Sequence, residues 1–451
     1  MDARTSFAAG LLIASVLLWP AVSAAQFDPF LPVPIPPVGP AQPAPETLAP
    51  QRAQTVTDRQ RPLFDPLGVR IEEFFLYPRL ELDESWNDNI FATSSGTKSD
   101  FITDLKPRVD LVSNFGAHSF NVSAGADIGW YATHTNQNYQ DAFGSTSGRY
   151  DIDQGQHIFG AAEIDRLHVP FTSPNFPNVV PGSIAAQPPI YTTYRAGVGY
   201  SQDALPVTYR GDLSVVRSEY QAVPAVGGGL LSQDDQNNWT YTLGLQGGYS
   251  LDPNWAVFAR GTGNFRDFDH AASAVNPKRN SAGYHADVGA RIDFGVIYGE
   301  AYLGYLEQIY QNSAYRTIRG IDGGARVVWN FTGLDTLQLN AVRTVNDLSQ
   351  SVFGPGFTAT GYLHSFVGLS LDHELLRNLL LNGNVAYIND AFKGVNRTDS
   401  GVDLGIGAKF LVRRELYLGA TYTFSHRDSS GAQAGQSFDQ NIFMLRIATQ
   451  L

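Results

Sequence analysis

The stretch GVDLGIGAKFLV, residues 401–412, alternates strictly between two kinds of side chain. One side holds Val402, Leu404, Ile406, Ala408 and Phe410, and the other holds Gly401, Asp403, Gly405, Gly407 and Lys409. Because successive side chains of a β-strand point to opposite faces, the pattern predicts a strand with one apolar face and one polar face. The pattern recurs along most of the chain, so the destination of these many apolar faces decides the fold.

The composition of the 451 residues indicates that much of the surface does not face water. Only 16% of the residues are charged, against roughly 25% in typical globular domains, although the hydrophobic fraction of 43% is ordinary. The formal net charge of −12 argues against nucleic acid as a partner. The chain has no Cys, which is compatible with an oxidising compartment such as a bacterial envelope.

The first 25 residues have the features of a secretory signal peptide. Arg4 precedes an apolar run over residues 7–19, and the small residues of AVSAAQ place a cleavage site near Ala24 or Ala25. A retained anchor is the alternative, but about a dozen apolar residues are fewer than the roughly 20 that a helical span needs. Residues 26–67 are rich in Pro and Ala, and we expect a disordered, extended periplasmic tether there.

Residues 68–451 alternate between strand patterns and turn signals. The expected strands are 75–90, 100–113, 118–132, 139–152, 157–168, 190–202, 207–220, 236–250, 254–267, 281–295, 297–311, 316–331, 335–348, 358–373, 377–390, 399–412, 415–427 and 438–451. Short and long connections alternate between them. The count of about eighteen is even, as in bacterial outer-membrane barrels.

Two stacked sheets cannot bury the apolar faces of eighteen strands, whereas a bilayer can. The predicted fold is therefore all-β: a transmembrane antiparallel up-and-down β-barrel with apolar faces toward lipid and polar faces toward the inside. Aromatic residues near strand ends, such as Trp130, Trp255 and Trp329, would form girdles at the two membrane interfaces. The last strand, SFDQNIFMLRIATQL (437–451), is of the kind that the barrel-assembly machinery recognises, although its final residue, Leu451, is not the usual aromatic.

Two segments resemble one known family. GVRIEEFFLYPRLELDESWNDNIFAT (68–93) and VGLSLDHELLRNLLLNGNVAYINDAFKGVNRTD (367–399) are similar to the opening and a late hairpin of the putative beta-barrel porin 2 family. The resemblance covers residues 68–451. It implies an outer-membrane barrel, in some members linked to exopolysaccharide export, and it supplies no catalytic motif.

The polar faces carry charges of both signs that are candidates for lining a lumen. The pore-lining candidates are Arg260, Arg266, Asp287, Arg291, Asp293, Glu300, Asp322, Arg326, Asp403 and Lys409. The four arginines would form an anion-attracting ladder opposed by Asp287, Asp293, Glu300 and Asp322. Alternatively, the charges pair across neighbouring strands. Glycines on the polar faces would widen the channel or, alternatively, permit close packing.

No motif indicates catalysis, because neither HExxH, GxSxG nor a metal-ligand spacing is present. The expectation is therefore a non-enzymatic pore of the bacterial outer membrane, without a cofactor, for passive passage of hydrophilic solutes. An exopolysaccharide secretion barrel and a structural or adhesive barrel with a blocked lumen remain alternatives; loops folded inward near 170–188 or 222–235 would favour the latter. The expected partners are bilayer, lipopolysaccharide, the barrel-assembly machinery, the solutes or a polysaccharide, and further copies of the chain.

Overall fold

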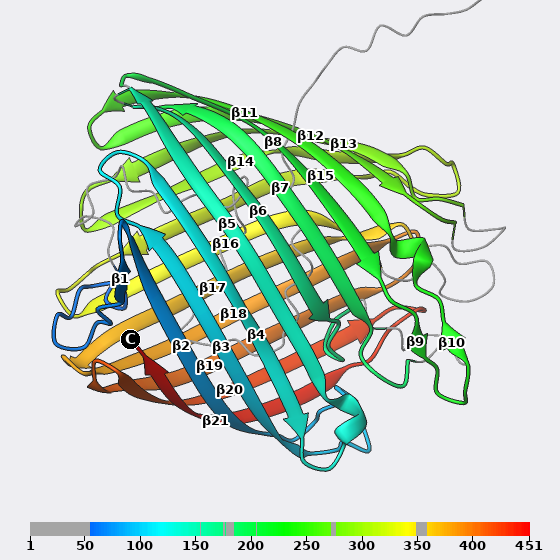
Figure 1. The fold of residues 1–451 in the computed structure, drawn as a ribbon. Coiled ribbons are helices and arrows are strands. Elements are labelled where there is room, and N and C mark those ends of the chain that lie inside the picture. Colours follow the sequence, from blue (N-terminus) through cyan, green and yellow to red (C-terminus); the bar gives the residue numbers. More distant parts are fainter. Residues whose placement is uncertain are drawn as a thin grey trace, which may run out of the picture.

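The computed structural model describes residues 55–153, 155–174, 176, 185–203, 205–271, 277–348 and 359–451. The expected signal peptide and most of the expected tether lie outside these residues. The described chain forms one barrel of long, tilted strands (Figure 1). No helix among the described residues is long and apolar enough to cross a membrane.

Eighteen long strands make the barrel wall. They are β2 (Phe74–Asn87), β3 (Asp100–Ser113), β4 (Ser119–Tyr131), β5 (Tyr139–Asp153), β6 (Gln156–His168), β7 (Ile190–Gln202), β8 (Val207–Tyr220), β11 (Asn238–Asp252), β12 (Trp255–Phe268), β13 (Ser281–Asp293), β14 (Ile297–Tyr310), β15 (Ile318–Trp329), β16 (Asp335–Asp347), β17 (Gly361–Leu376), β18 (Leu379–Lys393), β19 (Thr398–Arg413), β20 (Leu416–Ser430) and β21 (Phe438–Gln450). Shorter elements are β1 (Val69–Ile71), β9 (Val223–Pro224), β10 (Leu230–Leu231) and the 3-10 helices η1 (Thr135–Gln137) and η2 (Asp234–Gln236).

Each long strand pairs antiparallel with its neighbours in sequence, and β2 pairs with β21 to close the sheet. The predicted eighteen-stranded antiparallel barrel is confirmed. All boundaries lie within three residues of those expected; β2, for example, ends at Asn87 instead of residue 90, and β17 extends to Leu376 instead of residue 373. A bulge between Glu374 and Leu376 accommodates the extra residues and moves the turn to Arg377 and Asn378.

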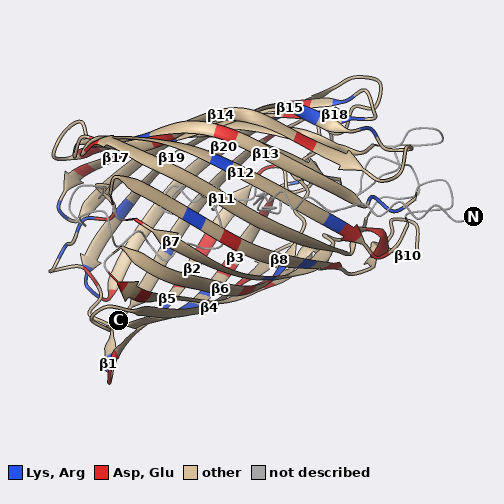
Figure 2. Ribbon diagram, turned by 90° about the horizontal axis from the view of Figure 1, so that it is seen from above, with Lys and Arg blue, Asp and Glu red and all other residues tan. Residues whose placement is uncertain are grey.

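The two faces of the wall differ as predicted. Apolar side chains such as Val288 and Ile406 are 66% and 62% exposed on the outside, whereas Asp287 and Asp403 beside them are 4% and 6% exposed. Basic and acidic residues lie close together along the wall (Figure 2). The outer surface is therefore the apolar one, which suits hydrocarbon rather than water.

The two ends of the barrel differ in their connections. Short turns, such as residues 253–254 and 414–415, lie at one end together with the C-terminus, which we call the short-turn end. Most connections at the opposite, long-loop end are longer, including residues 88–99 and 169–189. Short and long connections thus alternate along the chain, as predicted.

β15 and β16 pair only in part. The register runs from Trp329–Leu337 to Gly324–Val342, so the remaining parts of the two strands, near the long-loop end, are not paired with each other. Buried apolar side chains from both sides of this break pack together: Leu306, Tyr310, Tyr315, Ile318, Val345 and Leu363.

Aromatic rings on the inner face lie over glycines of the neighbouring strand. A Cβ on Gly129 would stand 2.2 Å from the Tyr139 ring, and one on Gly199 would stand 2.3 Å from the Phe159 ring. The Tyr139 hydroxyl thereby reaches Asp104 and donates a hydrogen bond of 2.7 Å. At these positions the glycines serve close packing, which is the alternative that the sequence left open.

The closing seam carries a buried ionic contact. Asp83 on β2 lies opposite Arg446 on β21. The Arg446 guanidinium donates two hydrogen bonds of 2.7 Å to the Asp83 carboxylate, and Lys106 approaches the same carboxylate at 3.1 Å. The Asp83 side chain is fully buried, so its charge is compensated only by these two cations and not by water.

We predict that Arg446→Met destabilises the folded barrel. The substitution removes the bidentate partner of a buried carboxylate, for which the expected loss is about 3 kcal/mol. Urea unfolding in detergent, followed by tryptophan fluorescence, measures the change. Arg413→Met is the control, because Arg413 is exposed and 3.5 Å from Glu415. Equal midpoints for the two variants would contradict the role assigned to the seam.

Candidate functional site

Two arginines of the expected ladder form ion pairs. Arg260 contacts Asp287 at 3.1 Å and lies 4.2 Å from the centre of the Tyr302 ring. Arg291 contacts Glu300 at 3.2 Å. Charges thus pair across neighbouring strands, as in the alternative interpretation, and this limits a continuous row of arginines facing the lumen.

The other six candidates occupy different surroundings. Arg266 is fully buried and donates to the Val345 carbonyl at 3.5 Å, and Arg326 lies opposite Glu300 in the β14–β15 register. Asp322 contacts His285 at 2.6 Å, and Asp293 accepts a hydrogen bond from the Gly295 amide in a turn. Asp403 lies 3.8 Å from Arg427, and the Lys409 ammonium lies 4.2 Å from the centre of the Tyr417 ring. These ten residues are spread over the wall and do not form one cluster.

The loop between β6 and β7 folds into the barrel. Val169, Phe176 and Ala185 are buried against Tyr191 and Val223 at the long-loop end. Ala185 also forms a β-bridge with Ala225, which ties the loop to the connection between β8 and β11. The start of the loop is therefore anchored on its own side of the barrel.

The first residues of this loop help to line a cleft. Residues 171–174 line it together with residues of β17–β21, including Tyr362 and Phe438. β17 is nine strands from β6 in both directions around the barrel, through β16 or through β18. The cleft therefore brings residues 171–174 together with strands that are remote from β6 in the sheet.

The cleft beside residues 171–174 contains about 590 Å³ of empty space, part of which is open to solvent. Its lining residues are Phe171, Thr172, Ser173, Pro174, Tyr362, His364, Ile388, Asp390, Arg397, Asp399, Arg427, Gln436 and Phe438. His364 contacts Asp390 at 2.6 Å, and the Arg397 Nε lies 2.9 Å from Asp399. The cleft therefore combines paired charges with aromatic rings.

Sequence reasoning did not single out this cleft. None of its lining residues is among the ten pore-lining candidates, because loop residues such as Thr172 show no periodicity. Alternation does place Arg427 and Asp399 on the polar faces of their strands, so that signal was present. Their proximity to the β6–β7 loop depends on how the barrel closes.

The long loops are also linked by ionic contacts. The Arg217 guanidinium donates to Asp269 at 2.6 and 3.0 Å and holds the pKa of that carboxyl below its usual value. Burial raises the pKa of Asp235, although the charge of Arg279 opposes the shift. Arg279 donates to the carbonyls of Asp235 and Leu348, and so joins three connections at the rim.

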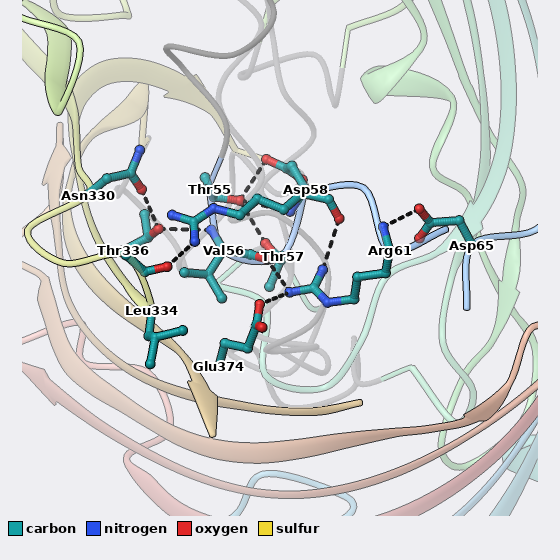
Figure 3. Close-up of polar contacts among 12 residues, drawn as sticks. Thr55, Val56, Thr57, Asp58, Arg61, Asp65, Asn330, Leu334, Thr336 and Glu374 are labelled. Atoms are coloured by element: carbon teal, nitrogen blue, oxygen red, sulfur yellow. Dashed lines mark hydrogen bonds and ion pairs between the residues drawn. The ribbon is translucent and has the colours of Figure 1, made fainter. Parts of the chain in front are cut away.

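Residues 55–67, the N-terminal strap, lie against the inner wall at the short-turn end (Figure 3). The fully buried Val56 donates its amide to Thr336 at 2.9 Å, and Arg61 contacts Glu374 at 2.7 Å. Phe64 packs against the apolar cluster of Leu411, Tyr417 and Ala448. The structure here differs from the expected disordered tether, because turn hydrogen bonds and buried contacts hold these residues in place.

No group of three or more His, Asp or Glu side chains within the described residues is arranged to hold a metal ion. The sites that the geometry does define are the loop across the long-loop end and the strap at the short-turn end.

A closed barrel with an apolar exterior and a polar interior defines the class of bacterial outer-membrane β-barrels. The chain belongs to the putative beta-barrel porin 2 family, whose model matches residues 61–451. This match confirms the resemblance of the two motifs and begins within the N-terminal strap. No curated protein matches the chain.

The solved structures to which the chain is similar include two from Pseudomonas aeruginosa, OccK2 (OpdF) and OpdK. OccK2 (OpdF) is 10% identical, with a TM-score of 0.43, over 84% of this chain and 99% of that chain. The structure of OpdK with vanillate is 10% identical, with a TM-score of 0.40, over 83% of this chain and 98% of that chain. A mutant of the ferric enterobactin receptor PfeA from the same organism is 7% identical, with a TM-score of 0.44, over 83% of this chain and 80% of that chain.

We predict that Glu374→Ala loosens the N-terminal strap. The Arg61 guanidinium would lose its carboxylate partner, and the backbone after Arg59 would become more accessible to trypsin. Mass spectrometry of limited digests of the detergent-folded protein measures the cleavage rate, which we expect to rise about tenfold, the factor for roughly 1.4 kcal/mol. Glu415→Ala, at the same end of the barrel, is the control. Unchanged cleavage after Arg59 in Glu374→Ala would show that this ion pair does not hold the strap.

Proposed function

We propose that the protein is a narrow channel for the passive passage of hydrophilic solutes across the outer membrane. The observation that carries the proposal is the closed eighteen-stranded wall with polar side chains inside. Barrels of this size enclose aqueous channels, whereas eight strands leave room only for side chains. The lumen would replace bulk water along a path through lipid, so that transport needs no cofactor.

The proposed orientation places the short-turn end in the periplasm and the long loops outside the cell, as is usual for such barrels. Export through a cleaved signal peptide over residues 1–25 and assembly through the C-terminal strand β21 belong to the same proposal. The contacts with lipopolysaccharide and with further copies of the chain stay predictions. The apolar outer face supports insertion into the bilayer.

The paired charges of the interior support weak rather than strong ion selectivity. Arg260 with Asp287 and Arg291 with Glu300 cancel most of each other's field at a distance. A solute would then be selected mainly by size and by hydrogen bonding at the loop. The proposal therefore does not use the continuous arginine ladder.

The inward loop also favours a second candidate, a structural barrel with a blocked lumen. The burial of Val169 and Phe176 is the specific observation behind it. Conduction decides between the two, because a blocked barrel passes no current.

We predict that the intact protein forms ion-conducting channels in planar bilayers and that the loop limits the current. Replacing residues 170–176 by a Gly-Ser linker of equal length removes the apolar anchors Phe171 and Phe176. The single-channel conductance is expected to rise roughly twofold or more, because a freed loop no longer divides the lumen.

The control replaces the exposed residues 312–314, in the loop after β14, by Gly-Ser-Gly and should leave the conductance unchanged. Folding of each variant is checked by its heat-sensitive migration in gels. Absence of current from the folded protein, with current restored by the linker, would instead support the blocked barrel.

A further inference from the structure

The cleft between the β6–β7 loop and the opposite wall has features of a binding site, an inference that rests on the proposed channel function. Residues from two remote parts of the chain meet there, with Phe171 and Thr172 on the loop and Arg427 on β20.

Three polar atoms in or beside the cleft lack hydrogen-bond partners among the described residues. They are Thr172 Oγ1, Arg427 Nη1 and Asp403 Oδ1. Thr172 and Arg427 line the cleft and are each 8% exposed, and Asp403 is 6% exposed next to Arg427. Buried polar atoms are normally paired, so these atoms point to a missing partner.

The position of Arg427 is shaped by its neighbours. A Cβ on Gly401, directly opposite on β19, would stand 2.0 Å from Arg427 Nη1. The glycine therefore leaves the space in which the guanidinium lies against the wall. Asp403 approaches the other terminal nitrogen only to 3.8 Å, which is too long for a hydrogen bond.

The three atoms differ in what they require. Arg427 Nη1 is a donor, Asp403 Oδ1 is an acceptor, and the Thr172 hydroxyl acts as either. An anion without hydroxyl groups accepts from Arg427 and Thr172 but gives Asp403 no donor, and a cation without them donates to Asp403 and Thr172 but gives Arg427 no acceptor. A hydroxyl group both donates and accepts, so a ligand with several hydroxyls can satisfy all three.

The remainder of the lining also suits a neutral ligand. The two carboxylates, Asp390 and Asp399, already contact His364 and Arg397. The rings of Phe171, Tyr362 and Phe438 supply apolar surface for the C–H groups of a ligand. The lining thus offers balanced charge, hydrogen bonds of both senses and aromatic faces.

We propose that this cleft binds neutral, hydroxyl-rich solutes. Thr172 and Arg427 are the main polar contacts, and Phe171 covers one face of the ligand. Binding in this cleft slows the passage of neutral polyols, whereas small ions pass beside the bound molecule.

The test compares three probes of equal size and different charge: glucose, glucuronate and glucosamine. Saturation-transfer NMR on the full-length protein in detergent measures binding, and planar-bilayer recordings separately measure block of the ion current. We expect glucose to bind and to reduce the current, and the two charged probes to do so at least tenfold more weakly.

Thr172→Val keeps the side-chain shape and removes the hydroxyl, and we expect about three- to tenfold weaker glucose binding. Phe171→Ala removes the ring and should weaken binding by a similar factor. Thr398→Val, at an exposed position of the same rim, is the matched control and should bind glucose as the unaltered protein does.

Binding of glucose with loss in Thr172→Val supports the site, even if the barrel carries no current and the channel proposal fails. Preference for glucuronate would show that Arg427 serves an anion and would overturn the neutral class. Absence of binding by all three probes, from a protein that conducts, would overturn the site and leave the channel intact.

Discussion

The pairing of every backbone amide and carbonyl inside hydrocarbon is the constraint on which the rest of this structure depends. An unpaired group in lipid costs several kcal/mol, so a membrane sheet must close on itself. Closure falls between β2 and β21, where Asp83 and Arg446 meet inside the wall. The partial break between β15 and β16 departs from full pairing, and a buried apolar cluster joins the strands on its two sides.

The interior follows from closure, because residues far apart in the chain now face one another. Charges that alternate along single strands find partners on neighbouring strands, as Arg260 finds Asp287. Aromatic rings lie over glycines of the neighbouring strand, so the inner face is more closely packed than its polar composition suggests. The β6–β7 loop and the N-terminal strap then reduce the free cross-section at opposite ends. The barrel therefore has many strands but a narrow path for solutes.

Much of the fold could be predicted because a strand in a membrane obeys one local rule. A side chain faces either lipid or lumen, and period-two alternation reports this directly for all eighteen strands. Boundaries were less predictable where turn and strand chemistry overlap, as at β17, whose bulge near Glu374 adds residues before the turn. The candidate site was less predictable still, since Thr172 and Arg427 come from segments that share no local pattern.

By itself, the sequence determined the class of fold, the strand number, the face that meets lipid and the family, because these depend on neighbours along the chain. The tertiary structure alone decided which charges pair, that residues 55–67 bind the inner wall, and that residues of the β6–β7 loop share a cleft with strands up to nine positions away. The physical reason is that the curvature of a closed sheet brings distant segments across a lumen, and no periodicity in the chain records that distance.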